Sequence, residues 1–284
     1  MILQKMKDLG GLVKISHTVF ALPFALASML VAAEGLPPLK LFLLVVGCMF
    51  FARNAGMAFN RWLDADIDAR NPRTASRHIP QGVFSKPFVL AFSLINAGVF
   101  VFLARSINPL CFALSPVAVG LLFGYSFMKR LTHFSHLFLG LVLGSSPVAA
   151  WAAVRGTLAV EPFILGAAVV FWVAGFDVIY ATQDYDFDRQ EGLHSLVVRL
   201  GIAKALWLAR LFHAATVALF LVFGLRLHFS FGYHLSLLLI ATLLIYEHSL
   251  VSAKDLSKVN AAFFNVNGFI SLIYLAGVVL SFNS

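Results

Sequence analysis

Two short acidic clusters hold the residues of this chain that are best suited to chemistry. Each cluster places three aspartates at alternate positions, and an asparagine stands four residues before the first of them in one cluster. The residues are Asn60, Asp64, Asp66 and Asp68 in the first cluster, and Asp184, Asp186 and Asp188 in the second. Together with Asp177, the clusters hold seven of only thirteen acidic residues in a chain with net charge +8. Such crowding of scarce carboxylates indicates a functional site.

The spacing of the clusters favours a divalent cation. On a helix, residues four apart share a face, so Asn60, Asp64 and Asp68 form one line and Asp184 with Asp188 forms another. Like charges at that spacing repel, whereas Mg²⁺ prefers oxygen ligands and uses one or two carboxylates plus substrate phosphate oxygens. The alternative role, solvated loop charges that set membrane topology, is disfavoured because acidic residues contribute little to orientation. We therefore expect the two lines to meet across a cavity and hold magnesium and a diphosphate.

Basic residues near the clusters are candidates for binding phosphate. Arg53 lies seven residues before Asn60 inside an apolar run, where an arginine costs about 2.5–3.5 kcal/mol on insertion scales and is a functional candidate by default. Its alternative role is to snorkel to the interface. Asp177 stands at the same distance before Asp184 and is either a base or half of a buried ion pair. Further basic candidates are Arg73, Arg77, Lys129 and Arg130. Taken singly, each of them would be interpreted as a loop charge or a topology anchor.

Composition places these residues in a membrane protein. The chain of 284 residues is 60% apolar and 12% charged, against about 25% charged residues in soluble domains. A bilayer-spanning helix needs about 20 mostly apolar residues, and nine runs qualify: 17–34, 39–59, 87–105, 108–127, 134–154, 161–182, 204–224, 233–252 and 260–281. We expect an all-α, polytopic bundle of about nine transmembrane helices, forming one membrane domain over residues 1–284. No nucleic-acid partner is expected.

The basic residues also predict the orientation of the chain. Sixteen lysines and arginines fall at the amino end and in the loops on its side, against four on the opposite side, with Arg53 set aside. The positive-inside rule then predicts a multi-pass inner-membrane protein with a cytoplasmic amino end and, after nine crossings, a carboxyl end outside. Both acidic clusters face the cytoplasm in this arrangement. Their similar positions after the second and sixth runs suggest a weak internal repeat.

These motifs, taken in order, resemble the signatures of the UbiA superfamily of intramembrane aromatic prenyltransferases, over nearly the whole chain. The resemblance rests on Asn60-x-x-x-Asp64-x-x-x-Asp68 with Arg73-Thr74-x-x-Arg77, on Tyr125-x-x-x-Lys129-Arg130, and on Asp177-x-x-Tyr180-Ala181 with Asp184-x-x-x-Asp188. The string from His17 to Phe24 is similar to the 4-hydroxybenzoate polyprenyltransferase-like branch, which includes futalosine-route menaquinone proteins. The Arg or Lys followed by Pro-Ile-Gly that is usual in hydroxybenzoate enzymes is absent there.

The resemblance implies an activity and a set of roles. A polyprenyl group would pass from polyprenyl diphosphate to a ring carbon of a hydroxylated aromatic acid, in ubiquinone or menaquinone biosynthesis, with Mg²⁺ as cofactor. Metal ligands would be Asn60, Asp64, Asp68, Asp184 and Asp188. Substrate-binding residues would be Arg53, Arg73, Arg77, Tyr125, Lys129, Arg130, Lys14 and His17. Asp177 or Tyr180 would orient or deprotonate the acceptor.

Several alternatives stay open at this point. Asn265 and Asn267, in the last apolar run, either contact the acceptor or simply bind neighbouring helices together. The acceptor itself is 4-hydroxybenzoate, a dihydroxynaphthoate, or a haem- or chlorophyll-type molecule. A secondary transporter would also explain charges among broken helices. A CDP-alcohol phosphotransferase would need an Asp-Gly-x-x-Ala-Arg signature that is missing here. Prenyl chain length and oligomeric state are not predicted.

Overall fold

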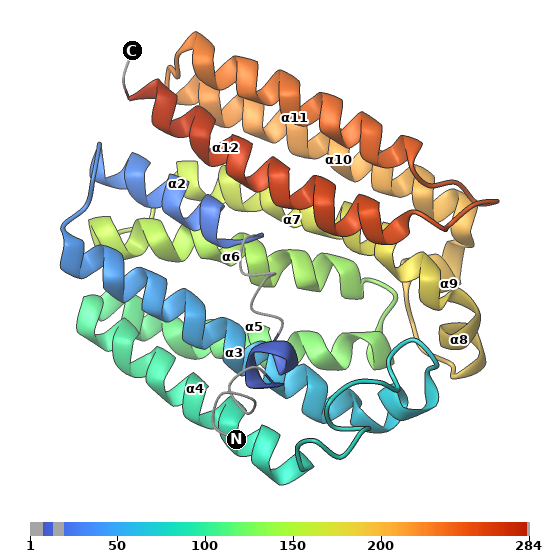
Figure 1. Cartoon of the computed structure of the whole chain (residues 1–284). Coiled ribbons are helices and arrows are strands. Elements are labelled where there is room, and N and C mark those ends of the chain that lie inside the picture. The colour runs from blue at the N-terminus through green and yellow to red at the C-terminus, as the bar shows by residue number, and fades with distance from the viewer. Residues whose placement is uncertain (1–7, 14–19, 283–284) are drawn as a thin grey trace. The chain divides into compact units, whose positions relative to one another are not determined.

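A computed structural model describes residues 8–13 and 20–282, and nearly all of these residues are helical. Within this part of the chain the extended structure amounts to one isolated bridge between Ser252 and Asp255. After a short helix at residues 8–12, the elements are α2 (Leu22–Ala33), α3 (Leu39–Arg70), α4 (Lys86–Ile107), α5 (Pro109–Leu131), α6 (Ser135–Arg155), α7 (Val160–Ala181), η2 (Thr182–Asp184), α8 (Tyr185–Gln190), α9 (Leu196–Leu200), α10 (Ile202–Arg226), α11 (Phe231–Ser249), η3 (Ala261–Val266) and α12 (Asn267–Ser281). The all-α prediction is confirmed (Figure 1).

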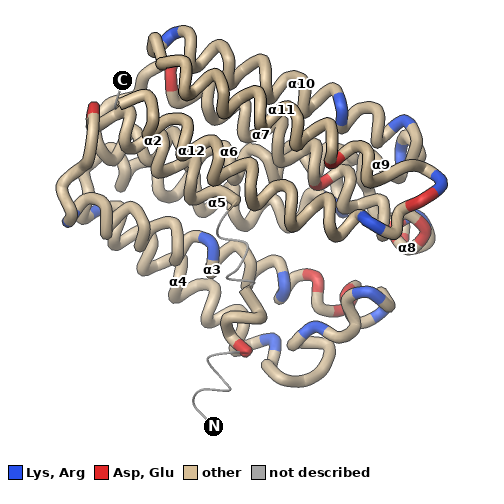
Figure 2. Tube along the Cα trace, turned by 45° about the horizontal axis from the view of Figure 1, so that its top comes forward, with Lys and Arg blue, Asp and Glu red and all other residues tan. Residues whose placement is uncertain are grey.

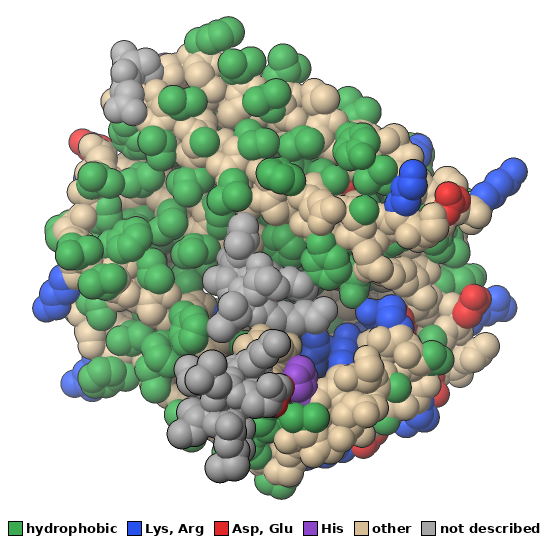
Figure 3. Space-filling view, in the orientation of Figure 1, with side chains coloured by type: hydrophobic (Ala, Val, Ile, Leu, Met, Phe, Trp, Pro, Cys, Tyr) green, Lys and Arg blue, Asp and Glu red, His purple; other side chains and the backbone are tan. Residues whose placement is uncertain are grey.

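Eight helical segments in the described residues are long and apolar enough to cross a membrane, and they match the second to ninth predicted runs. The first predicted run, 17–34, contains the 12-residue helix α2. Lys14 and His17 lie outside the described residues. Apolar side chains cover much of the outer surface of α11 and α12 in Figure 3, as expected where lipid is the solvent. The chain is a polytopic membrane protein.

The described residues fall into two compact units, and the expectation of a single membrane domain stays a prediction. The first unit holds residues 8–13 and 39–127. In it, α3 packs along α4, and buried polar contacts join the two helices. Asn54 donates to Asn96 Oδ1 at 3.2 Å, and the Ser93 hydroxyl donates to the Ala55 carbonyl at 2.8 Å. Such contacts hold helices together where hydrophobic driving force is weak.

The second unit holds residues 20–38 and 128–282, and α7 forms its centre. Glycines let α6 approach α7 closely, because a Cβ added at Gly140 would lie 2.4 Å from the Val170 carbonyl oxygen. Small residues at such crossings are typical of membrane helices. On the other side of α7, Trp172 is buried against Phe24 of α2, with ring centroids 5.0 Å apart. This packing fixes the helix that leads into the second acidic cluster.

Two helices differ from the predicted runs in ways that matter for the site. The second run was predicted to end at residue 59, but α3 continues to Arg70, so the first acidic cluster is helical throughout. The last run is divided into the π-helix η3 and the α-helix α12. Asn267, at the junction, donates to the carbonyls of Ala262 and Phe263, both at 3.2 Å. A π-turn is often found at functional positions in helices.

Candidate active site

The first acidic cluster lies on one face of α3, as its spacing predicts. The Asn60 amide donates to Asp64 Oδ2 at 3.1 Å. Asp64 and Asp68 are only 2% and 4% exposed, whereas Asp66 is exposed and pairs with Lys86 at 2.7 Å. Because 3.6 residues make one turn, the first and third aspartates turn to the buried face and the middle one turns away. Asn60, Asp64 and Asp68 therefore lie on one face of α3, and their role as a metal site stays a prediction.

A turn after α3 folds back onto the last aspartate of this line. Arg77 donates to Asp68 Oδ1 at 2.6 Å, and the Thr74 hydroxyl donates to the Asp68 carbonyl at 3.0 Å. Asn71 closes the turn by accepting from the Arg73 amide at 2.9 Å. The motif that suggested a basic phosphate loop thus has a structural function, which is to orient Asp68. Binding of substrate by Arg73 and Arg77 stays a prediction.

The remaining basic candidates extend from two helices. Arg53 is partly buried two turns before Asn60 on α3 and so lies on about the same face. Tyr125 and Lys129, four residues apart, lie in the last two turns of α5. The Lys129 carbonyl accepts from the His194 amide at 2.7 Å, which ties this helix end to the segment after α8. Charged positions gather mainly at helix ends in both units (Figure 2).

The second acidic cluster repeats the exposure pattern of the first on a broken helix. The structure interrupts the helix with the 3₁₀ turn η2 at Thr182–Asp184 before α8 begins. Asp184 and Asp188 are partly buried, and Asp186 is exposed. Gly192, at φ +67°, ends this segment in the left-handed conformation that favours glycine. Both clusters therefore shield their outer two aspartates and expose the middle one.

A histidine that the sequence did not single out joins this half of the site. His136 Nδ1 lies 2.7 Å from Asp177 Oδ2, and the His136 ring is buried while the Asp177 side chain is 21% exposed. An ionised carboxylate only accepts hydrogen bonds, so Nδ1–H is the donor. The two residues are 41 positions apart, and no local spacing could have paired them. The signal was a histidine at the start of an otherwise apolar run.

The other acceptor-side candidates divide into two groups. The Tyr180 ring packs on Phe263 of η3, with centroids 4.3 Å apart, and Asn265 is exposed. Asn267 is fully buried and donates to Glu247 Oε1 at 2.8 Å. This contact joins two neighbouring helices, which is one of the two roles considered for Asn267 from the sequence. Contact of either asparagine with the acceptor stays a prediction.

The oxygen-rich composition of the clusters suits magnesium. Among residues 8–13 and 20–282, no three His, Cys, Asp or Glu side chains lie together as a metal-binding group. Mg²⁺ takes one or two protein carboxylates and completes its shell with water and phosphate. Asn60 with Asp64 offers an amide and a carboxylate oxygen in one place. Asp68 is committed in part to Arg77, and its role as a ligand stays a prediction.

Comparisons with known proteins agree with one another. A model of the UbiA prenyltransferase family matches residues 21–273. A 4-hydroxybenzoate octaprenyltransferase of Vibrio cholerae is 32% identical over 279 residues, which are 97% of this chain and 94% of that protein. The apo structure of a UbiA homologue from Aeropyrum pernix is 33% identical, with a TM-score of 0.85 over 93% of this chain and 97% of that chain. A UbiA homologue from Archaeoglobus fulgidus, bound to GPP and Mg²⁺, shares the fold at 21% identity, with a TM-score of 0.73 over 98% of this chain and 100% of that chain.

Proposed function

Because the chain belongs to the UbiA prenyltransferase family, we propose that it transfers a polyprenyl group from polyprenyl diphosphate to a ring carbon of a hydroxylated aromatic acid. 4-Hydroxybenzoate is the leading acceptor, since the relatives that match this chain over almost their whole length are named 4-hydroxybenzoate octaprenyltransferases. The product of such a transfer is an early intermediate of quinone biosynthesis. Family membership also disfavours the transporter and CDP-alcohol phosphotransferase alternatives.

The observation that carries the proposal is the exposure pattern that the two acidic clusters share. In each, the first and last aspartates are shielded and the middle one is exposed. Burying carboxylates is costly unless they are paired or bind a cation. Asp68 is paired with Arg77. We assign Asp64, Asp184 and Asp188, with Asn60, to Mg²⁺, because carboxylate and amide oxygens are ligands that Mg²⁺ prefers. When bound, Mg²⁺ would neutralise charge on the diphosphate.

The protein's own residues then have separate tasks. Arg53, Lys129 and Arg130 bind diphosphate oxygens and stabilise the charge that develops as the allylic C–O bond breaks. The ring carbon of the acceptor forms the new C–C bond, and the ring loses a proton. We assign that proton to Asp177, which His136 holds in place at 2.7 Å. The diphosphate leaves with the electron pair of the broken C–O bond, and loss of the proton returns an electron pair to the ring and restores its aromaticity.

A membrane location suits this chemistry. Each CH₂ group of a polyprenyl tail costs about 0.8 kcal/mol in water, so the donor stays in lipid, and the allylic cation needs protection from water. We propose that the amino end and both acidic clusters face the cytoplasm, from which a polar acceptor arrives. The excess of Lys and Arg in the loops on that side supports this orientation.

The proposal is tested by direct synthesis in membranes that contain the protein. Parallel reactions would supply one polyprenyl diphosphate, Mg²⁺, and either 4-hydroxybenzoate or a dihydroxynaphthoate, and the products would be identified by mass. We expect a prenylated 4-hydroxybenzoate that disappears with EDTA and returns when Mg²⁺ is restored. Prenylation of the naphthoate alone would show that the acceptor is a dihydroxynaphthoate and not 4-hydroxybenzoate. The absence of a covalent product with either acceptor would refute the proposed prenyl transfer.

A further inference from the structure

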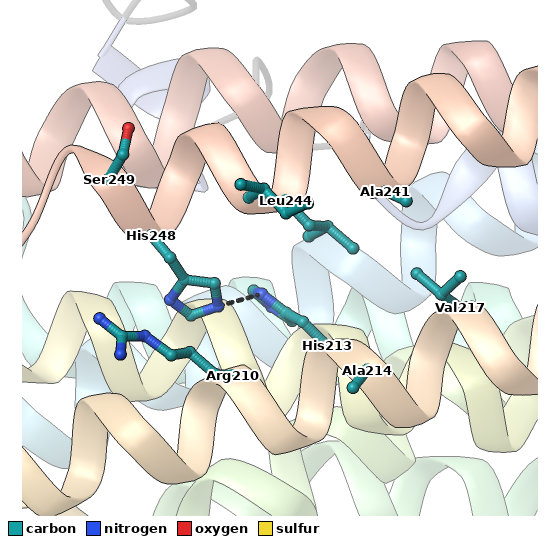
Figure 4. A pocket seen from close by; sticks show the side chains of 9 residues that line it. Arg210, His213, Ala214, Val217, Ala241, Leu244, His248 and Ser249 are labelled. Atoms are coloured by element: carbon teal, nitrogen blue, oxygen red, sulfur yellow. Dashed lines mark hydrogen bonds between the residues drawn. The ribbon is translucent and has the colours of Figure 1, made fainter.

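A groove between α10 and α11 is lined by none of the residues assigned to prenyl transfer. It has a volume of about 540 Å³ and is lined by side chains from both helices (Figure 4). The lining residues are Arg210, His213, Ala214 and Val217 of α10, and Ala241, Leu244, Ile245, His248 and Ser249 of α11. Both helices are candidate membrane spans. The groove therefore opens where a bilayer would surround the second unit.

The lining changes from polar to apolar along the groove. Arg210 lies near the start of α10, and His248 and Ser249 lie at the end of α11. Because the two helices run in opposite directions, these polar groups share one end, while Val217 and Ala241 lie further into the span. Arg210 is eight residues from the start of α10, or about 12 Å at 1.5 Å per residue. A long side chain at that depth reaches the headgroup layer.

Arg210 brings an available positive charge to the polar end. Its side chain is exposed, and none of the salt bridges among the described residues includes it. The arginine at the opposite end of the same helix differs, since Arg226 pairs with Glu161 at 3.0 Å. A guanidinium recognises phosphate through parallel hydrogen bonds. The polar end is thus complementary to a phosphate.

Two imidazoles add a second, more selective feature. His213 Nε2 lies 3.3 Å from the Trp172 carbonyl, and His213 Nδ1 lies 3.0 Å from His248 Nε2. A carbonyl can only accept, so Nε2 of a neutral His213 carries its proton and Nδ1 accepts from His248. With both rings neutral, His248 Nδ1 is left as an acceptor, and Figure 4 shows it on the side of Arg210. The polar end of the groove is therefore complementary to a ligand that carries an anionic group beside a hydrogen-bond donor.

The interior of the unit holds these rings in place. His213 is buried, and its ring lies so close to Gly175 of α7 that an added Cβ would be 2.3 Å from it. Glu247 Oε2 is 3.8 Å from His213 Nδ1, and Asn267 holds the other oxygen of that carboxyl group. The orientation of His248 is thereby set by α7, α10 and α12 together, which makes the groove preorganised.

We propose that this groove binds one glycerophospholipid of the surrounding bilayer. Its phosphate pairs with Arg210, and an O–H or N–H of its headgroup donates to His248 Nδ1. An acyl chain lies along Val217 and Leu244. Phosphatidylglycerol and phosphatidylethanolamine offer both the phosphate and the donor, whereas phosphatidylcholine has the phosphate without the donor. The site is independent of the prenyl-transfer proposal.

Trp207 is a natural reporter for this site. It is three residues before Arg210, on the same side of α10, and is 57% exposed, while Trp151 and Trp172 are buried. The protein would be reconstituted in phosphatidylcholine vesicles containing a brominated form of each lipid, and tryptophan quenching would be recorded. Trp207→Phe identifies the signal of that residue. Native mass spectrometry of the purified protein would count the lipid that stays bound.

We expect brominated phosphatidylglycerol and phosphatidylethanolamine to quench Trp207 more strongly than brominated phosphatidylcholine. Arg210→Gln should weaken binding of phosphatidylglycerol about tenfold, the loss expected for one charge-assisted contact. Arg226→Gln, on the same helix outside the groove, should leave it unchanged. His248→Phe should abolish the preference over phosphatidylcholine.

Two results would overturn the proposal. Equal quenching by all three lipids, or unchanged binding in Arg210→Gln, would mean that the groove contacts bulk lipid without selecting it. Release of the bound phospholipid by a polyprenyl diphosphate, with loss of the Trp207 signal, would assign the groove to the prenyl donor instead.

Discussion

His136 Nδ1 lies 2.7 Å from Asp177 Oδ2, and the pair joins the start of α6 to α7, the helix that leads into the second acidic cluster. The imidazole is buried and the carboxylate reaches a partly open surface. We propose that His136 is a positioning residue, which fixes one oxygen of Asp177 and leaves the other to act. A carboxylate held in one rotamer is better suited to orient an acceptor or to take its proton than one that is free to turn.

His136→Ala should lower kcat/KM for the aromatic acceptor by about tenfold to a hundredfold, because a hydrogen bond to a charged group contributes about 1.5–3 kcal/mol. The KM for polyprenyl diphosphate should change little. Steady-state kinetics with each substrate varied in turn would measure both quantities. His136→Gln, which keeps a donor at this position, should recover part of the loss. Equal effects on both substrates would indicate a purely structural role.

Asp64→Ala and Asp184→Ala should each abolish Mg²⁺-dependent prenylation while the protein stays in the membrane. The clusters provide their own controls, since Asp66 and Asp186 are exposed at the middle position of each. Asp66→Ala and Asp186→Ala should keep most of the activity. Product formation in membranes, normalised to the amount of protein, is the measurement. Full activity in Asp64→Ala or Asp184→Ala would refute the assignment of that aspartate as a Mg²⁺ ligand.

Arg77 and Asp68 should behave as one unit. Their side chains are 2.6 Å apart, and the Asp68 side chain is 5% exposed, so removing either partner leaves a charge without its main neighbour. Arg77→Ala, Asp68→Ala and the double variant form a cycle whose coupling we expect at about 0.5–3 kcal/mol. The cycle would be read from the KM for polyprenyl diphosphate. Additive effects would show that Arg77 and Asp68 act independently of each other.

Asn267→Leu should destabilise the protein by about 0.6–2 kcal/mol, because it leaves the Glu247 carboxyl group buried without its donor. Replacing both residues by leucine should recover part of this loss, since neither polar group is then left buried. Thermal unfolding in detergent measures the effect. A raised acceptor KM with an unchanged melting temperature would instead place Asn267 in the substrate site.

Composition and periodicity alone predicted a large part of the fold. Lipid leaves no water to satisfy backbone groups, so each apolar run of about 20 residues has one solution, a helix. The runs from 87–105 to 260–281 therefore appear as helices close to their predicted bounds, and the run 39–59 forms the first part of α3. The placement of Asn60, Asp64 and Asp68 on one face followed equally directly, because helical spacing is a local property. Family resemblance then supplied the reaction.

Only the tertiary structure decided which partners these residues have. His136 meets Asp177 across 41 positions, and Asn267 meets Glu247 across 20. Such pairs depend on how the helices pack. Hydropathy does not predict this packing, because an apolar helix face is about equally stable against lipid and against another helix. The same holds for the extension of α3 to Arg70 and for the turn that brings Arg77 back to Asp68. Local spacing determined where the acidic side chains point, and packing determined what holds them there.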